Sequence, residues 1–238
     1  MTENARVTDD ARMSILEHLT EFRQRLLKAV IAVGVGLIVG TIATPQLIGV
    51  LVRPLGDQVP MAIAPTESPI VFFKISLIVG LVVAMPVIVY QVFMFAAPGL
   101  KPNEKRYILI GAPAVALCFA AGVAFAGVVL IPAAIPFMDI FFGSFVEQRY
   151  SIDRYISFVS TVLLWTGLVF ETPVVMFFFS KLGVTSHKTF TKARKGVIIG
   201  AAVVAAIITP THDPFNMLLV MIPFLILYEL GILLSRLA

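Results

Sequence analysis

The chain alternates between long runs of apolar residues and short connectors that are rich in proline and charge. A transmembrane helix needs about 20 apolar residues to cross a hydrocarbon core of about 30 Å, and most of the runs reach that length. The pattern therefore predicts an all-α, polytopic membrane protein that forms a single six-helix transmembrane domain over residues 1–238. The six predicted spans are residues 26–44, 70–96, 107–131, 155–180, 197–209 and 215–234.

The last two runs differ from the others. Residues 197–209 extend over only about 20 Å as a helix at 1.5 Å per residue, and the final run is expected to be broken by Pro223. One interpretation is a short hairpin beside a concavity where the membrane is locally thinned. The other is a tight hairpin that packs inside the bundle. The pattern favours neither.

The fourth run contains a single charged residue. Glu171 is the only charge within residues 155–180, where a carboxylate costs about 2.5–3.5 kcal/mol on insertion scales. Ser157, Ser160 and Gly167 fall within about 40° of it at 100° per residue, so this small, polar face is expected to turn away from lipid. The carboxyl group is interpreted either as functional or as a protonated, hydrogen-bonded structural group.

Basic residues predict the orientation of the chain. An even number of spans places both termini on the same side of the membrane. Fourteen of the eighteen Lys and Arg residues lie on that side, around the N-terminal tail and the connectors Pro98–Arg106 and Leu182–Lys195. The positive-inside rule therefore predicts that both termini are cytoplasmic.

Composition excludes several classes of function. The chain is 59% apolar, with a mean hydropathy of +0.98, and 13% charged, against about 25% in soluble proteins. Its bases flank the apolar runs, so the net charge of +4 does not indicate nucleic-acid binding. The single Cys118 cannot form an intramolecular disulfide, and His18, His187 and His212 lack metal-ligand spacing. No phosphate loop or His-Glu-x-x-His pair occurs, so we expect no enzyme activity, metal or cofactor.

Acidic side chains lie among bases at the predicted cytoplasmic edge. Glu21 precedes Arg25 by four residues in an amphipathic N-terminal segment, and Glu104 precedes Lys105 in the first cytoplasmic connector. A helix on the membrane surface, with ordinary helix capping, accounts for part of this pattern. The anionic inner leaflet favours bases there, so the two acids also indicate a site for a cationic partner.

Several blocks of sequence, in order along nearly the whole chain, carry a family resemblance. They are residues 18–26 (HLTEFRQRL), 68–74 (SPIVFFK), 84–100 (AMPVIVYQVFMFAAPGL), 167–174 (GLVFETPV), 209–214 (TPTHDP) and 223–229 (PFLILYE). Together they resemble the TatC family, the receptor subunit of the twin-arginine protein translocase. The resemblance implies a concave, glove-like six-helix bundle in the cytoplasmic (inner) membrane.

The resemblance also implies a function and partners. TatC proteins bind the twin-arginine signal peptides of folded cargo proteins and recruit the single-span subunits TatA and TatB, so a hetero-oligomer driven by the proton-motive force is implied. The residues implied for signal-peptide binding are Glu21, Arg23, Phe95 and Glu104.

Other implied positions lie in the spans and outer loop. The implied polar or partner-contacting residues are Glu171, Thr209, Asp213 and Asn216, and Pro54 is implied as a functional residue of the first periplasmic loop. Family members often carry the aspartate directly after Thr-Pro-Pro, whereas Thr211 and His212 intervene here. The register of partner contacts after Asp213 is therefore not determined by the motif.

Two other functions fit parts of the pattern. A small proton-coupled secondary transporter would use Glu171 as a proton relay. Such transporters usually contain inverted repeats, and the chain has no such symmetry. A structural scaffold for membrane assembly would need no peptide specificity. Crosslinking of a twin-arginine peptide near Glu104 would separate the three functions.

Overall fold

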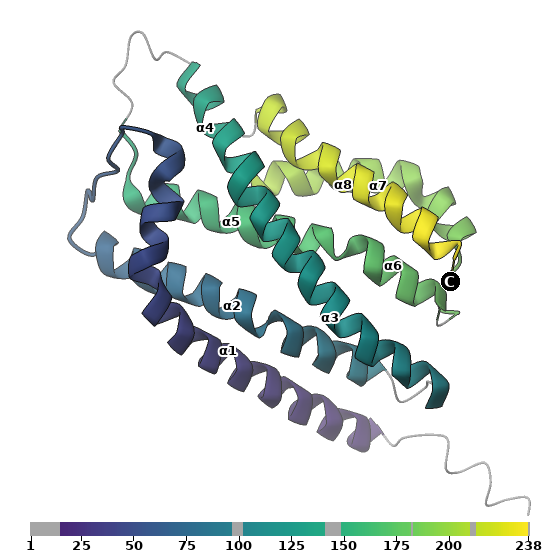
Figure 1. Cartoon of the computed structure of the whole chain (residues 1–238). Helices are drawn as coiled ribbons and strands as arrows, with labels where there is room; N and C mark the ends of the chain where they lie inside the picture. The colour runs from purple at the N-terminus through teal and green to yellow at the C-terminus, as the bar shows by residue number, and fades with distance from the viewer. Residues whose placement is uncertain (1–14, 97–101, 141–148, 182, 210–212, 238) are drawn as a thin grey trace, which may run out of the picture.

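Helices make up nearly all of the structure (Figure 1). The computed structural model describes residues 15–96, 102–140, 149–181, 183–209 and 213–237. The all-α class is confirmed, and the β pairing found within these ranges is one isolated bridge between Met61 and Ser151. The helices are α1 (Ile15–Val52), η1 (Arg53–Leu55), α2 (Glu67–Ala96), α3 (Pro102–Phe125), η3 (Ala126–Leu130), α4 (Ile131–Ile140), α5 (Ile152–Phe170), α6 (Thr172–Lys181), α7 (His187–Ile208) and α8 (Pro214–Ser235).

Within the described residues, five helical stretches are long and apolar enough to cross a membrane. They are Glu17–Leu55, Glu67–Phe95, Pro113–Phe137, Ile152–Lys181 and Pro214–Ser235. The chain is thus a multi-pass membrane protein. The predicted span 197–209 forms the C-terminal half of α7, whose N-terminal half is basic, and it is not among the five. The sixth crossing therefore stays a prediction.

The prolines do not interrupt the helices at the positions that the sequence predicts. The first helix was expected to end at Thr44, but α1 passes Pro45 and continues to Val52, and Figure 1 shows it bending partway along. The final run was expected to break at Pro223, but α8 is continuous through it. By contrast, the fourth run is divided at Glu171, because Pro173 has no N–H to continue the hydrogen bonding of α5. Neighbouring helices decide which prolines are tolerated.

The closest helix contact joins α1 to α2. A Cβ atom on Gly40 would lie 2.1 Å from the carbonyl oxygen of Ser76, and one on Gly36 would lie 2.3 Å from that of Gly80. One turn further, the hydroxyls of Thr44 and Ser76 are 2.9 Å apart, and both residues are buried. Small residues let two membrane helices approach to backbone contact, and a buried hydroxyl pair adds a directional bond. The pair α1–α2 is therefore locked at one register.

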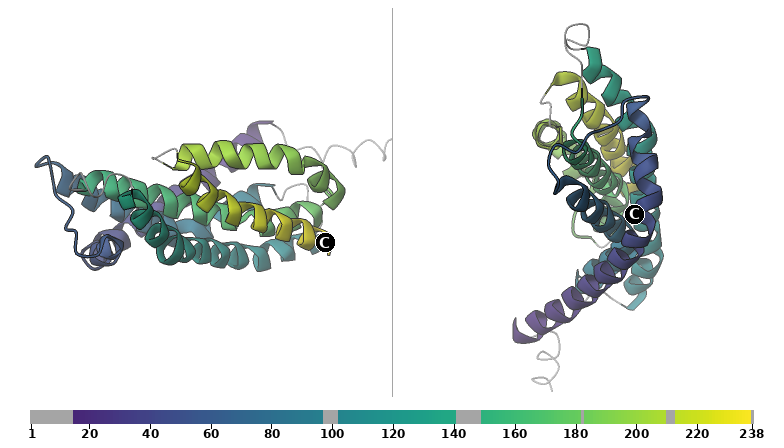
Figure 2. Two further views of the ribbon diagram at one scale, coloured as in Figure 1. Left: turned by 90° about the horizontal axis from the view of Figure 1, so that it is seen from above. Right: turned by 90° about the vertical axis from the view of Figure 1, so that its left-hand side faces the viewer.

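The remaining helices build the bundle on α2. Helix α3 packs against α2 and α5, α8 packs against α6 and α7, and α5 lies at the centre (Figure 1). Phe119 fills the space above Gly167, and the Phe178 ring fills that above Gly111. Helix α1 lies outside this arrangement and diverges from it (Figure 2), with 11% of its apolar window buried against 39% for Ile152–Lys181. Its position depends mainly on the contact with α2.

This dependence predicts opposite effects for two glycines of α1. Gly40→Ala should lower the free energy of unfolding by about 1–3 kcal/mol, because its Cβ overlaps the Ser76 carbonyl. Gly34→Ala has nothing within 4 Å of its Cβ and should raise that free energy by about 0.5–1 kcal/mol through the loss of unfolded-chain entropy. Thermal unfolding in detergent, followed by the fluorescence of the single Trp165, would measure both. Equal shifts for the two variants would contradict a backbone contact at Gly40.

Candidate functional site

Glu21 and Arg25 form an ion pair near the N-terminal end of α1. The Arg25 guanidinium donates to the Glu21 Oε1 atom through Nε, at 2.8 Å, and through Nη2. This confirms the predicted i,i+4 pair. The other carboxylate oxygen, Oε2, is buried and accepts no hydrogen bond from any residue that the structure describes. One acceptor of Glu21 is therefore held in place by Arg25, and a second is left for an outside donor.

Aromatic rings surround the end of α2 that faces this pair. Phe95 stacks on His18 with ring centroids 4.5 Å apart and an angle of 25°. Phe22 meets Phe95 edge-on, with centroids 5.4 Å apart. The structure thus brings Phe95 next to the turn of α1 that carries Glu21. His18 and Phe22 were not among the predicted site residues, although both lie in the motif that carries the family resemblance.

An apolar groove continues from these rings along the two helices. Its volume is about 330 Å³, and it is lined by Phe22, Arg25, Leu26 and Ala29 of α1 and by Ile88, Gln91, Val92 and Phe95 of α2. We call it the α1–α2 groove. Gln91 is 8% exposed, and its Oε1 atom is buried with no partner among the described residues. A polar acceptor thus lies within an otherwise apolar lining.

The other two predicted peptide-binding residues are placed less closely. Arg23 is exposed and lies about 200° around α1 from Glu21, so Arg25 is the residue that contacts this acid. Glu104 lies in the first turn of α3, and its side chain falls outside the described residues.

Glu171 lies at the break between α5 and α6. Its backbone carbonyl accepts hydrogen bonds from Val174 N at 3.1 Å and Val175 N at 3.0 Å, so it starts the second helix as it ends the first. Its side chain is half-buried, and the Oε1 atom is buried without a partner in the part of the chain that the structure describes. A local break in the helix thus coincides with the single acid within residues 155–180.

The polar face predicted for α5 is turned inward along part of its length. Ser160 and Gly167 are buried, and Ser157 accepts a hydrogen bond from Lys74 Nζ at 2.6 Å. Lys74 also pairs with Asp153 Oδ1 at 2.6 Å, which ties α2 to the first turn of α5. The sequence analysis did not identify this pair, because Lys74 and Asp153 are 79 positions apart.

The α7–α8 turn buries two of the predicted partner-contacting residues. Thr209 is 1% exposed, and its hydroxyl donates to the Ala205 carbonyl at 2.8 Å. Asn216 is 3% exposed, and its backbone and side-chain N–H groups each donate to the Asp213 carboxylate at 2.8 Å. Asp213 is therefore the N-cap of α8. These side chains therefore make hydrogen bonds at the end of α7 and the start of α8.

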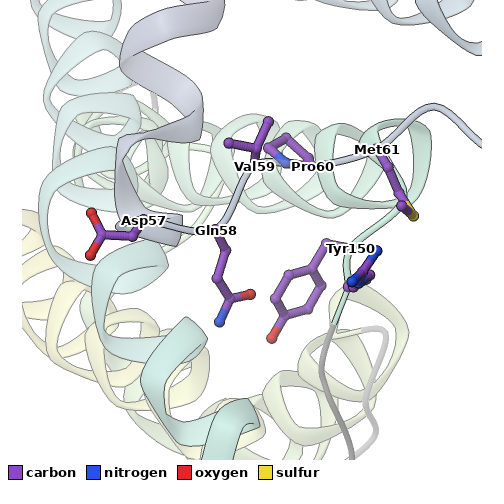
Figure 3. A pocket seen from close by; sticks show the side chains of 7 residues that line it. Asp57, Gln58, Val59, Pro60, Met61 and Tyr150 are labelled. Atoms are coloured by element: carbon purple, nitrogen blue, oxygen red, sulfur yellow. The ribbon is translucent and has the colours of Figure 1, made fainter.

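A polar pocket lies at the other end of the molecule from Phe95, beside the short helix that contains Pro54. Pro54 lies within η1, which ends at Gly56 in the left-handed region at φ 61°. The pocket has a volume of about 330 Å³ and is lined by Asp57, Gln58, Val59, Pro60, Met61, Arg149 and Tyr150. Figure 3 shows the Gln58 and Tyr150 side chains turned toward the same space. Backbone bonds from Met61 N to Tyr150 O at 3.0 Å and from Ile152 N to Met61 O at 2.9 Å join the two loops.

Comparison with known proteins identifies a family and relatives that this chain resembles. The family model for the Sec-independent protein translocase protein (TatC) matches residues 17–223. The chain is 34% identical to the Sec-independent protein translocase protein TatC of Carboxydothermus hydrogenoformans, over 96% of this chain and 95% of that protein. It is 35% identical to the protein of the same name from Deinococcus radiodurans, over 95% of this chain and 87% of that protein.

A solved structure agrees with these relatives. The crystal structure of the twin arginine translocase receptor TatC in DDM matches this fold with a TM-score of 0.84 and 34% sequence identity, over 92% of this chain and 99% of that chain. Sequence and fold thus agree along nearly the whole length, and the chain belongs to the TatC family of Sec-independent protein translocase proteins.

Proposed function

We propose that this translocase component is the receptor that binds signal peptides with paired arginines at the surface formed by Glu21 and Phe95. The observation that carries the proposal is the buried Oε2 atom of Glu21, which has no partner among the described residues and lies beside the aromatic rings of His18, Phe22 and Phe95. Arginine keeps its charge and presents a planar fork that binds carboxylates and stacks on aromatic rings. A carboxylate oxygen and stacked rings on adjacent turns match both properties of the guanidinium group.

In this proposal Glu104 binds the second arginine of the signal peptide. Glu104 lies in the first turn of α3, which follows α2 closely in sequence after Phe95. An acid in the first turn of a helix is stabilised in its charged form by the helix dipole. In this proposal Arg23 contributes no direct contact with the peptide, since like charges repel.

The proposed orientation places this surface in the cytoplasm. Both termini and the connectors Pro98–Arg106 and Leu182–Lys195 belong to the side with fourteen of eighteen basic residues, which the positive-inside rule assigns to the cytoplasm. The membrane is then the cytoplasmic (inner) membrane, and α7 supplies the sixth crossing. Its apolar part is short, which is consistent with a locally thinned bilayer.

A surface on the last two helices is proposed to recruit the single-span subunits TatA and TatB. An apolar groove of about 520 Å³ is lined by Ala193, Gly196, Val197, Gly200, Ala201, Val204 and Phe224. Small residues at a four-residue spacing let a second membrane helix approach closely. Because Thr209 and Asn216 are buried and bond within their own helix ends, we assign the contact to this groove. Export is then driven by the proton-motive force.

The alternative of a small proton-coupled transporter finds no support. The matches along nearly the whole chain are to protein translocase subunits. Glu171 is therefore assigned to protein export or partner assembly. Its half-buried carboxyl group lies at a helix break within the membrane, where an ionisable residue indicates a functional site. We propose that it contacts the exported protein or a partner subunit.

Cysteine labelling tests the orientation. In a Cys118→Ala background, Asn103→Cys should react with a membrane-impermeant maleimide only from the cytoplasmic side. Thr66→Cys, in the loop before α2, should react only from the outer side and serves as the matched control. Labelling of position 103 from the outside would overturn the topology.

Glu21→Gln tests the arginine site. The variant should weaken binding of an Arg-Arg peptide by roughly tenfold or more, because a hydrogen bond to a charged group contributes about 1.5–3 kcal/mol. It should matter far less for a Lys-Lys peptide, which lacks the forked contact. Glu17→Gln removes the same charge one turn away. It should change the affinity for either peptide by no more than about twofold, because surface charges are screened by solvent. Equal losses for both peptides with Glu21→Gln would show that Glu21 does not read arginine.

Substitution of Glu171 separates function from folding. Glu171→Gln keeps hydrogen-bonding capacity and should insert and unfold like the wild type, yet it should reduce export or partner assembly. Glu171→Asp retains the carboxylate and should preserve most of the activity. Export rates and co-purification of TatA and TatB would measure the effect. Full activity of Glu171→Gln in both assays would remove any special role for the carboxylate.

A further inference from the structure

The polar pocket beside η1, which we call the η1 pocket, lies where membrane-crossing helices end. The candidate span Glu17–Leu55 ends just before Asp57, and the span Ile152–Lys181 begins just after Tyr150. The headgroup layer begins where apolar helices leave the hydrocarbon core, and tyrosine is enriched at that depth. The η1 pocket therefore opens at the level of the phospholipid headgroups.

The lining of the η1 pocket separates hydrogen-bond donors from an acid. Figure 3 shows the Gln58 amide and the Tyr150 hydroxyl turned toward one space, and Arg149 belongs to the same lining. The Asp57 carboxylate is turned away from Gln58 and Tyr150 (Figure 3). A guanidinium group has several N–H donors, so it binds a phosphate oxygen as well as another acceptor. Donors on one side and a carboxylate on the other match a zwitterion that carries a phosphate and an ammonium group.

The loop that forms one wall of the pocket also carries exposed apolar side chains. Val59 is 88% exposed and Ile63 is 73% exposed, and Met61 between them is exposed as well. Val59 and Met61 belong to the pocket lining. Apolar side chains at the membrane boundary gain free energy when acyl chains cover them. A ligand with a polar head and an apolar chain therefore suits this loop better than a free anion does.

The two walls of the pocket are held together without a ligand. The backbone bonds of Met61 with Tyr150 and Ile152 join the two loops. The Ser151 hydroxyl donates to the Glu67 carboxylate at 3.1 Å and ties the second loop to the start of α2. Because the walls are already ordered, binding of a ligand costs little conformational entropy.

We propose that the η1 pocket binds the headgroup of one phosphatidylethanolamine molecule from the surrounding membrane. Arg149 and Tyr150 donate hydrogen bonds to its phosphate, and Asp57 pairs with its ammonium group. An acyl chain of the same lipid covers Val59. This site lies at the opposite end of the molecule from Phe95 and does not depend on the proposed binding of signal peptides.

Asp57 determines which phospholipid is preferred. The ammonium group of ethanolamine has N–H donors for a carboxylate, whereas the quaternary nitrogen of choline has none. Phosphatidylglycerol brings a negative charge without a cation, so a carboxylate at the pocket repels it. The preferred headgroup is therefore zwitterionic and carries a primary amine.

The lipid preference is tested on the full wild-type chain in detergent micelles. Native mass spectrometry measures the binding of phosphatidylethanolamine, phosphatidylcholine and phosphatidylglycerol with identical acyl chains. Phosphatidylethanolamine should bind roughly fivefold more tightly than either of the others, as for one additional hydrogen bond. Equal binding of the three lipids would overturn the proposal. Displacement of the lipid by millimolar inorganic phosphate would show a site for free anions and would overturn it as well.

Substitutions in the lining test which residues hold the headgroup. Arg149→Gln should weaken binding of phosphatidylethanolamine by roughly tenfold, because it removes a charged donor to the phosphate. Arg154→Gln removes the same charge from an exposed residue at the same end of the molecule, outside the lining, and should change binding by less than about twofold. Asp57→Asn should bring the affinity for phosphatidylethanolamine close to that for phosphatidylcholine. Equal losses for the two arginine variants would show a general effect of charge and would overturn the site.

A further variant separates lipid binding from folding. Arg149→Lys keeps a positive charge and N–H donors, so it should bind phosphatidylethanolamine within about threefold of the wild type. The unfolding temperature in detergent without added lipid should be the same for the wild type and both Arg149 variants. A loss of binding by Arg149→Lys that equals the loss by Arg149→Gln, at an unchanged unfolding temperature, would overturn the contact with the phosphate. Binding of an Arg-Arg peptide should be unaffected in all of these variants, because its proposed site lies at the other end of the molecule.

Discussion

The contact between α1 and α2 positions the proposed binding surface. The two helices run antiparallel, and Gly36 and Gly40 face Gly80 and Ser76 at backbone distance. The same register, continued by about four turns, places Glu21 opposite Phe95 and Arg25 opposite Gln91. Because α1 is otherwise mostly exposed, little else holds its N-terminal half in place. A change of register at the glycines would separate the acid from the rings.

Polar groups inside the bundle are mostly paired at helix ends. Lys74 is neutralised by Asp153 where α2 meets the start of α5. At the exposed surface between α7 and α8, Arg194 contacts Glu229 at 2.6 Å. Tyr155 and Tyr228 each donate to a backbone carbonyl of another helix, at 2.7 and 2.8 Å. In a medium without water these bonds replace solvation, since an unsatisfied polar group there costs several kcal/mol. They therefore tie the helices together in pairs.

Among the described residues, buried oxygen atoms without a hydrogen-bond partner occur at Glu21, Gln91 and Glu171, and the Ser180 hydroxyl is a further exception. The oxygens of Glu21 and Gln91 lie along the α1–α2 surface, and that of Glu171 lies at the α5–α6 break. Carboxylate and amide oxygens that are buried without a donor are suited to accept hydrogen bonds from another chain. The proposed peptide site and the polar group at Glu171 share this physical basis.

Much of the architecture followed from the sequence. Apolar runs of bilayer length identified the spans, since hydrophobic length is a property of each segment, and the Glu21–Arg25 pair followed from helical spacing. The motifs also indicated Phe95 and the break residue Glu171.

Other features depended on contacts between segments that are distant in sequence. Pro45 and Pro223 remain inside helices while Pro173 ends one, and the burial of Thr209 and Asn216 follows from the α7–α8 turn. The Lys74–Asp153 pair and the groove around Gln91 require two helices at one register. Sequence periodicity assigns a residue to a face of its own helix. Only tertiary packing decides what that face contacts, because the register between two helices determines which residue of the neighbour lies opposite each position.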